Sequence, residues 1–345
     1  MNKYIILFLI NLLFIQCSKQ DCDDYYKKYN SFDKFPIVEK WKFNTFSKNK
    51  YMLPPSTFSI LDDRYLVLVN KKNHNIIHLY NIEKRELIKS FGNKGKGPGE
   101  YMGISDILYE KRNNRIFIYD ATQKKFDIVN LTDILRQKRF KPNMTTKVSL
   151  DGGIPLRWEI INSDTLLATG GLNKRLCFYN SKFDTIKTEG YIPGNFSDRK
   201  DIFKYLTSTD IVKNDDEKKI AFGNRTNDIL EIFRFNGKIK KTIHGPDINK
   251  PGWLASSSIP TGYFDLASSS KYIYCVYSGE KTNDKMDWIK TLGKNILIFN
   301  WEGKPIKKIE LDHRIGDIVI SEKNKTIYFI FYDGDYFRLG YHQLD

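Results

Sequence analysis

The chain has 345 residues, 41% of them hydrophobic and 14% aromatic, and this content supports a substantial core within a single domain. Its four cysteines are too sparse to indicate a framework of disulfide bonds. The formal net charge of +15 is compatible with nucleic acid, anionic lipid or acidic glycan as a partner. The positive residues are nevertheless dispersed as pairs at turns, such as Lys71-Lys72 and Lys240-Lys241, where lysine protects exposed sheet edges.

The first segment has the pattern of an export signal. Lys3 precedes an apolar run over residues 4–15, which is too short for a comfortable transmembrane helix. The run stops at Cys17 and so resembles a bacterial lipoprotein signal, although Gln16 stands where a small residue is usual. We predict a lipoprotein-type signal peptide over residues 1–16, lipidation at Cys17 and a tether over residues 17–35; a retained anchor helix is the alternative.

A pattern of two apolar strands separated by a polar break then recurs about every 50 residues. Its many phenylalanines and tyrosines favour pleated, half-buried surfaces. A repeat of this length with several strands per unit is typical of a propeller or a solenoid. Six copies share one apolar anchor position, occupied by Leu66, Ile116, Leu166, Ile220, Ile273 and Ile327.

A shorter apolar strand precedes most anchors, which makes four strands per unit. The sixth unit has no chain left for a long final strand, whereas the apolar segment 37–43 precedes the first unit and lacks a partner. We therefore predict an all-β fold over residues 36–345, a six-bladed β-propeller of four-stranded antiparallel blades. The N-terminal strand at 37–43 is expected to close the ring, because an open ring would expose sheet edges.

Residues 91–101, Phe-Gly-Asn-Lys-Gly-Lys-Gly-Pro-Gly-Glu-Tyr, are the most specific string in the chain. The string resembles the blade-joining signature of NHL-type propellers, and more closely that of the TolB-like six-bladed propeller lipoproteins of Gram-negative bacteria. Residues 298–305 and 341–344 resemble the same family. The resemblance covers residues 36–345 and implies a six-bladed fold and an envelope location, but little about activity.

The glycines of this string fit a loop that joins two blades, since glycine lets the backbone turn and proline stiffens the crossing. A phosphate cradle is the alternative, but it needs a helix on one side, and strands are expected on both. The blade-joining loop is assigned to Gly92, Gly95, Gly97, Pro98, Gly99 and Glu100.

Acidic residues recur on the short first strands and are the best candidates for a site at the channel mouth. Several carboxylates that converge on the ring axis could hold Ca²⁺, as some lactonase-type propellers do. Alternatively, each aspartate accepts hydrogen bonds from backbone amides of the neighbouring blade and fixes the blade spacing. With the residues that replace them in blade three, the candidates are Asp106, Arg157, Glu159, Asp210, Asp265 and Asp317.

The chain lacks a recognisable catalytic set, so the sequence favours a lipid-anchored, non-catalytic binding or scaffold module for a protein or glycan partner. This hypothesis includes no cofactor, no nucleic acid, a monomer, and an outer-membrane lipoprotein that faces the periplasm or the surface. The alternative is a Ca²⁺-dependent enzyme of lactonase or lyase type. A third option is a basic receptor for acidic polysaccharide, whose binding would fall steeply with salt.

Overall fold

The structure is a computed structural model. It describes residues 29–31, 34–51, 55–71, 73–136, 140–149, 153–170, 174–190, 210–225, 229–245, 258–283 and 288–344. The predicted signal peptide and the lipidation site at Cys17 lie outside these residues. Within them, no helix combines the length and the apolar character that crossing a membrane requires.

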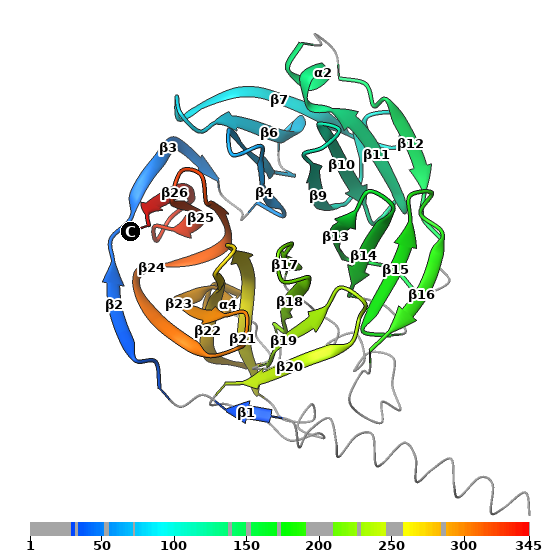
Figure 1. Cartoon of the computed structure of the whole chain (residues 1–345). Helices are drawn as coiled ribbons and strands as arrows, with labels where there is room; N and C mark the ends of the chain where they lie inside the picture. The colour runs from blue at the N-terminus through cyan, green and yellow to red at the C-terminus, as the bar shows by residue number, and fades with distance from the viewer. Residues whose placement is uncertain are drawn as a thin grey trace, which may run out of the picture.

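The described strands form six antiparallel blades around a central axis (Figure 1). Blade one contains β4 (Phe58–Leu61), β5 (Tyr65–Val69), β6 (Asn75–Asn81) and β7 (Glu86–Lys94), with β8 (Glu100–Tyr101) added beside β7. Blade two contains β9 (Ile104–Glu110), β10 (Arg115–Asp120), β11 (Lys125–Asn130), helix α2 (Leu131–Arg136) and β12 (Met144–Lys147). Blade three contains β13 (Arg157–Asn162), β14 (Thr165–Thr169), β15 (Leu176–Asn180) and β16 (Thr185–Glu189).

Blade four contains β17 (Val212–Asn214), β18 (Lys219–Gly223), β19 (Ile229–Arg234) and β20 (Ile239–His244). Blade five begins with β21 (Ser258–Ser268), β22 (Tyr272–Asn283), helix α4 (Trp288–Thr291) and β23 (Gly293–Asn300). The long strand β24 (Pro305–Ser321) is first the outer strand of blade five and then the inner strand of blade six. Blade six continues with β25 (Thr326–Tyr332) and β26 (Phe337–Gln343).

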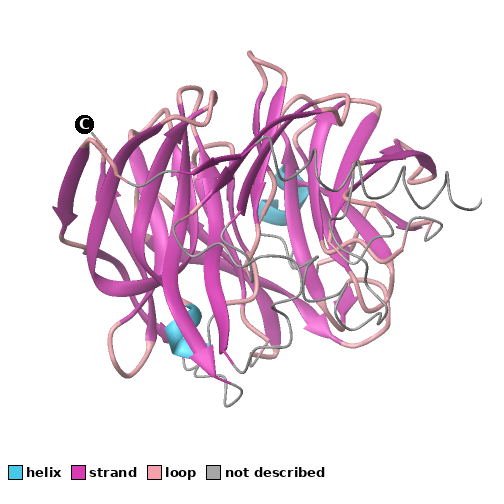
Figure 2. Cartoon of the chain, turned by 90° about the horizontal axis from the view of Figure 1, so that it is seen from below, coloured by secondary structure: helices cyan, strands magenta, loops and turns pink. Residues whose placement is uncertain are grey.

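The predicted six-bladed, all-β fold is confirmed. Each predicted anchor lies on the second strand of its blade, from Leu66 in β5 to Ile327 in β25. In Figure 2 the strands run through the thickness of the ring and leave its two faces to turns and loops. The spacing of the apolar anchors therefore reports the repeat of one blade.

The N-terminal segment differs from the prediction. Residues 37–43 were expected to complete the last blade, but β2 (Ile37–Trp41) instead pairs in parallel with the blade-five part of β24. The strand that pairs with β26 is the next one, β3 (Asn44–Tyr51). Before them, β1 (Tyr29–Ser31), within the predicted tether, pairs in parallel with β20. The chain thus runs along the outside of blades four and five before it joins blade six (Figure 1).

The physical reason lies in the different burial of the two strands. Ile37 and Val38 of β2 are 44% and 57% exposed, so the apolar character of this strand does not mark an interior position. β3 is mostly polar, because an outer strand shows one face to solvent. Its Phe46 and Tyr51 are buried between blades six and one.

The hydrophobic core lies between neighbouring blades. Ile77 of blade one packs in one cluster with Ile118 of blade two, and Phe126 of blade two lies 4.9 Å from Trp158 of blade three, centroid to centroid. Each seam therefore holds two blades at a fixed angle, and the inner strands are held in register around the axis.

Candidate functional site at the central channel

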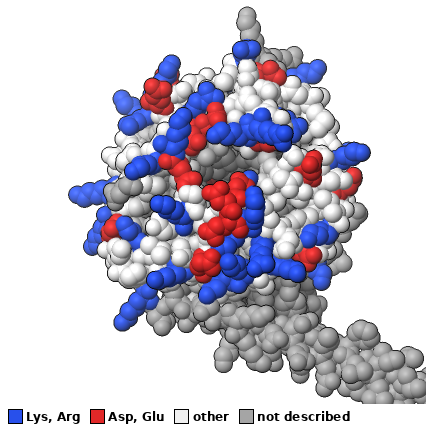
Figure 3. All heavy atoms as spheres, in the orientation of Figure 1, with Lys and Arg blue, Asp and Glu red and all other residues white. Residues whose placement is uncertain are grey.

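The inner strands of the blades line a cavity of about 380 Å³ on the ring axis. Figure 3 shows a hollow near the centre of one face, with acidic side chains beside it and lysine and arginine side chains around it. Predicted site residues on this lining are Asp106 of β9, Glu159 of β13 and Asp210, which precedes β17. Because alternate side chains of an inner strand point to the axis, equivalent positions of different blades converge there.

Two of the predicted aspartates join consecutive blades. Asp106 Oδ2 accepts a hydrogen bond from the backbone N–H of Trp158 at 2.7 Å, and Asp265 Oδ2 accepts one from the backbone N–H of Ile318 at 2.9 Å. Asp106 Oδ1 also accepts the N–H of Ile107. These are the inter-blade bonds that the structural alternative requires of the recurrent aspartates.

Arg157 holds the centre of the cluster. Its Nε lies 2.6 Å from Asp210 Oδ1, and another guanidinium N–H donates to the carbonyl oxygen of Ser105. This single side chain of blade three therefore contacts blade two on one side and the start of blade four on the other.

Burial perturbs the titration of the clustered acids. Burial, reinforced by the charge of Asp210, raises the pKa of Asp106 to about 8 and that of Asp317 to about 6. The same two causes raise the pKa of Asp265 well above its ordinary value, and Asp265 is fully buried. Asp106 is therefore largely protonated at pH 7, and the raised pKa of Asp265 acts in the same direction, which lowers the negative charge that the channel must accommodate.

Two arginines lie near these acids, and their pKa values shift in opposite directions. Burial opposes the charge of Arg157, but the nearby carboxylates, Asp210 foremost, raise its pKa above the ordinary value. Burial, together with the charge of Arg157, lowers the pKa of Arg225. The Arg225 guanidinium also lies 4.5 Å from the ring centroid of Phe264.

A second polar layer contains Glu159 and Lys213. Lys213 Nζ lies 3.7 Å from a Glu159 carboxylate oxygen and 3.4 Å from one of Asp215, and it donates to the carbonyl oxygen of Ile160 at 2.7 Å. Burial raises the pKa of Glu159 against the opposing charge of Lys213. The structure thus brings all six predicted channel residues within electrostatic reach of one another. Three of them line the cavity, Arg157 pairs with Asp210, and Asp265 and Asp317 interact with this pair through their charges.

The channel acids are poorly arranged to bind a metal ion. Within the described ranges, no three His, Cys, Asp or Glu side chains are close enough together to bind one ion jointly. Ca²⁺ takes six to eight oxygen ligands. The two arginines also lie among the carboxylates that would have to supply them.

The chain matches the TolB-like 6-blade propeller-like family over residues 32–323. It belongs to this family.

Solved structures similar to this TolB-like propeller share its fold at low sequence identity. A protein from Bacteroides fragilis NCTC 9343, provisionally named an exported protein, is 11% identical, with a TM-score of 0.57 and coverage of 92% of this chain and 100% of that one. A member of the DUF4221 family from Bacteroides vulgatus ATCC 8482 is 9% identical, with a TM-score of 0.51 and coverage of 88% and 98%. The β-propeller domain of Cps50 (Swd1) from Myceliophteria thermophila is 10% identical, with a TM-score of 0.50 and coverage of 87% and 99%. No curated protein matches the chain.

The glycine-rich loop of this TolB-like propeller runs from β7 of blade one to β9 of blade two. Its concave side is occupied by its own Glu100, whose Oε2 accepts the N–H of Gly97 at 2.8 Å. A Cβ added at Gly95 would lie 2.2 Å from the same oxygen, and Gly99 has a φ of +73°. Pro98 lies in the turn before Gly99. Strands flank the loop, and its amide donor serves an internal carboxylate where a phosphate cradle would need it for a ligand.

The loop is also fixed to blade two. Gln123 Nε2 donates to the carbonyl oxygens of Gly95 and Glu100, and Lys125 Nζ donates to that of Glu100 at 3.2 Å. Gly92, with a φ of +70°, precedes the turn and packs against Ile77 and Tyr101. These contacts place the segment at the junction of two blades.

Sequence reasoning missed Arg225, Lys213 and Asp215. Arg225 follows β18 in a polar break and carries no repeat signal, because the other blades have no arginine at this position. Lys213 lies three residues after the predicted site residue Asp210, and this closeness in the sequence was the one signal that could have identified it.

Proposed function

We propose that the chain is a lipid-anchored binding or scaffold module of the bacterial cell envelope that holds a protein or glycan partner at a face of the propeller without catalysing a reaction. The observation that carries this proposal is that the channel acids bind to other groups of the propeller itself. Asp106 and Asp265 accept backbone amides of the next blade, and Asp210 pairs with Arg157. A catalytic or metal-binding carboxylate has to be free for its ligand, whereas these stabilise the ring.

Export to the envelope is supported by the apolar run that ends at Cys17 and by the family of lipoproteins that the chain resembles. The similar Bacteroides fragilis protein also carries the name of an exported protein. In the proposal, the chain is a monomer on the outer membrane, faces the periplasm or the surface, and does not bind nucleic acid.

The anchor is tested with the full chain and its Cys17→Ala variant in a Gram-negative host. Wild type is expected in the outer-membrane fraction with an acylated N-terminal peptide in mass spectrometry, and the variant in a soluble or unprocessed form. Wild-type chain that is soluble and unacylated would contradict the anchor.

Binding is tested by cross-linking the tagged, full chain in intact cells of its host, with an unrelated lipidated propeller as the reference. A protein or glycan recovered reproducibly with this chain and absent from the reference supports a binding module. Recovery equal to the reference for every species would count against it.

A Ca²⁺-dependent enzyme of lactonase or lyase type is the second candidate, because aspartates from four blades converge on the axis. It requires that Ca²⁺ displace the arginines or the backbone amides from these acids.

A further inference from the structure

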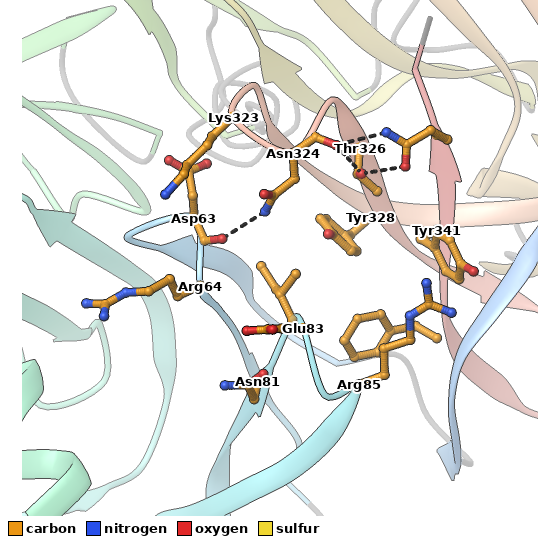
Figure 4. A pocket seen from close by; sticks show the side chains of 13 residues that line it. Asp63, Arg64, Asn81, Glu83, Arg85, Lys323, Asn324, Thr326, Tyr328 and Tyr341 are labelled. Atoms are coloured by element: carbon orange, nitrogen blue, oxygen red, sulfur yellow. Dashed lines mark hydrogen bonds between the residues drawn. The ribbon is translucent and has the colours of Figure 1, made fainter.

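A second cavity, of about 470 Å³, lies at the seam between the first and last blades (Figure 4). We call it the seam pocket. One wall comes from the turns of blade one and the other from β25 and β26 of blade six. Its defining residues are Phe46, Asp63, Glu83, Arg85, Tyr328 and Tyr341. The volume falls within the range of roughly 300–1,000 Å³ that small-molecule sites occupy.

Aromatic rings form the apolar part of the seam pocket. Phe46 and Tyr328 are buried, and their ring centroids lie 5.7 Å apart, edge to face. Tyr341 is half-buried and carries the Arg85 guanidinium 4.4 Å from its ring centroid. Figure 4 shows the rings of Tyr328 and Tyr341 on the blade-six side, with Arg85 reaching up to Tyr341 from blade one.

A guanidinium stacked on a ring keeps the N–H groups of its edge available to a ligand. Arg85 and Lys323 both line the pocket, and neither has a carboxylate partner among the residues that the structure describes. Glu83, in the same turn as Arg85, is exposed and supplies acceptor oxygens on the blade-one side (Figure 4).

Asp63 and Asn324 make a rigid polar end to the pocket. Asp63 Oδ1 accepts a hydrogen bond from Ser321 Oγ at 2.8 Å, and its carbonyl oxygen accepts one from Asn324 Nδ2 at 2.9 Å. Gln343 Nε2 donates to the carbonyl oxygen of Asn324 at 2.9 Å. The second carboxylate oxygen of Asp63 accepts no hydrogen bond from the described residues, so it remains for a ligand in a preorganised position.

We propose that the seam pocket binds one sugar ring of an uncharged glycan. A pyranose presents apolar C–H faces and a rim of hydroxyls that both donate and accept hydrogen bonds. Tyr341, the partly exposed ring of the three, suits those faces, and the edges of the buried Phe46 and Tyr328 supply apolar wall behind it. Arg85 and Lys323 suit hydroxyl acceptors, and Asp63 and Glu83 suit hydroxyl donors. A third cation of the lining, Arg64, is paired with Asp62 outside it. The remaining two cations and two acids balance, so an anionic sugar would gain at Arg85 what it loses at Glu83.

This inference rests on the proposed function, because it names the partner class and the place of binding. The test is an array of neutral oligosaccharides of glucose, mannose, galactose, xylose and N-acetylglucosamine, with uronate-containing and sulfated oligosaccharides as the anionic arm. The full chain is expected to bind a neutral member, and isothermal titration with that member gives the affinity.

The decisive variants are Arg85→Asn and Glu83→Gln, which leave the core untouched. Asparagine tolerates the positive φ of 55° at position 85. Each is expected to weaken binding by about tenfold, as for the loss of one or two ligand hydrogen bonds. Lys84→Ala is the matched control, since Lys84 lies between them but outside the pocket lining and its side chain is 68% exposed.

Neutral binding that falls in both variants and persists in Lys84→Ala supports the seam site. No binding to the array, binding to anionic members alone, or equal binding by all variants overturns it. If the wild-type chain binds no sugar on the array but still captures a partner in cells, the seam site fails and the binding module stands. Failure of both experiments removes both.

Discussion

The side-chain carboxyl group of Asp106 in blade two accepts a hydrogen bond from the backbone N–H of Trp158 in blade three, with Oδ2 and N 2.7 Å apart. The relationship recurs between Asp265 of blade five and Ile318 of blade six. Because each bond joins the inner strands of consecutive blades, the acids of the channel carry part of the cohesion of the ring. Substitutions of these acids are therefore expected to change the stability of the fold, whether or not the channel binds a ligand.

Asp106→Ala is expected to lower the free energy of unfolding by about 1–3 kcal/mol, because the N–H groups of Ile107 and Trp158 lose their buried acceptor. Asp106→Asn is expected to cost less, since an amide oxygen can accept one of these bonds. Urea unfolding followed by tryptophan fluorescence measures both. Asp312→Ala, at an exposed position of β24, is the control and should leave the unfolding midpoint unchanged. Equal effects of Asp106→Ala and Asp312→Ala would show that the inter-blade bond contributes nothing.

The raised pKa of Asp106 predicts a pH dependence of opposite sign to that of a typical salt-bridged aspartate. The native state binds a proton that the unfolded chain releases, so this contribution to stability is complete below about pH 4 and disappears as the pH rises to about 8. Between pH 5 and 7.5 the wild-type chain is therefore expected to lose up to about 1 kcal/mol per pH unit relative to Asp106→Asn. The difference between the two chains is the quantity to measure, because titrating groups remote from the channel cancel in it, and what is left belongs to Asp106 and the acids coupled to it. Parallel curves would mean that Asp106 is ionised in the native state.

The fold could be predicted from the sequence because one blade repeats six times, and the anchor positions sample the same buried site in every copy. The error at the N-terminus has a physical cause. Outer strands are half-exposed, so the mostly polar strand β3 can serve as the outer strand of blade six, while the apolar Ile37 and Val38 of β2 lie at the surface. Hydrophobicity therefore identifies inner strands reliably and outer strands poorly.

The convergence of the channel acids could also be predicted, because equivalent positions on inner strands face one axis. The partners of these acids could not. Arg225 comes from a polar break of one blade, and nothing in the repeat marks it. The seam pocket was beyond reach as well, because it depends on contacts such as that of Ser321 with Asp63, which the topology makes but no local spacing reveals.

A buried ion pair joins blades three and four. Removal of one partner is expected to cost more stability than removal of both. Arg175 and Glu231 are each 1% exposed, with Arg175 Nε 2.7 Å from Glu231 Oε2. Arg175→Met leaves a buried carboxylate without its cation and is expected to cost about 3–5 kcal/mol. The double variant with Glu231→Leu is expected to recover most of that loss. A double-mutant cycle in urea measures the coupling, and additive effects would contradict a direct pairing.

The N-terminal strands β2 and β3 are expected to contribute very different amounts to the stability of the fold. Phe46→Ala in β3 removes a buried ring between blades six and one and is expected to cost about 3–5 kcal/mol. Ile37→Ala in β2 removes a side chain that is 44% exposed and is expected to change stability by less than about 1 kcal/mol. Thermal and urea unfolding of the two variants provide the comparison. The reverse order would assign the structural role to residues 37–43, as the sequence suggested.

Calcium separates the two candidate functions most directly. If the channel acids bind Ca²⁺ at a concentration one hundred times the dissociation constant, the native state gains about 2.7 kcal/mol, which raises the melting temperature by several degrees. The binding-module proposal expects no such shift, because the acids are occupied by Arg157 and by backbone amides of the neighbouring blades. Differential scanning calorimetry with millimolar CaCl₂, against MgCl₂ at equal ionic strength, makes the comparison. A Ca²⁺-specific shift that disappears in Asp317→Asn would establish a channel metal and return the enzyme hypothesis to first place, since Asp317 is the least strongly perturbed of the three raised aspartates and the easiest to ionise for a cation.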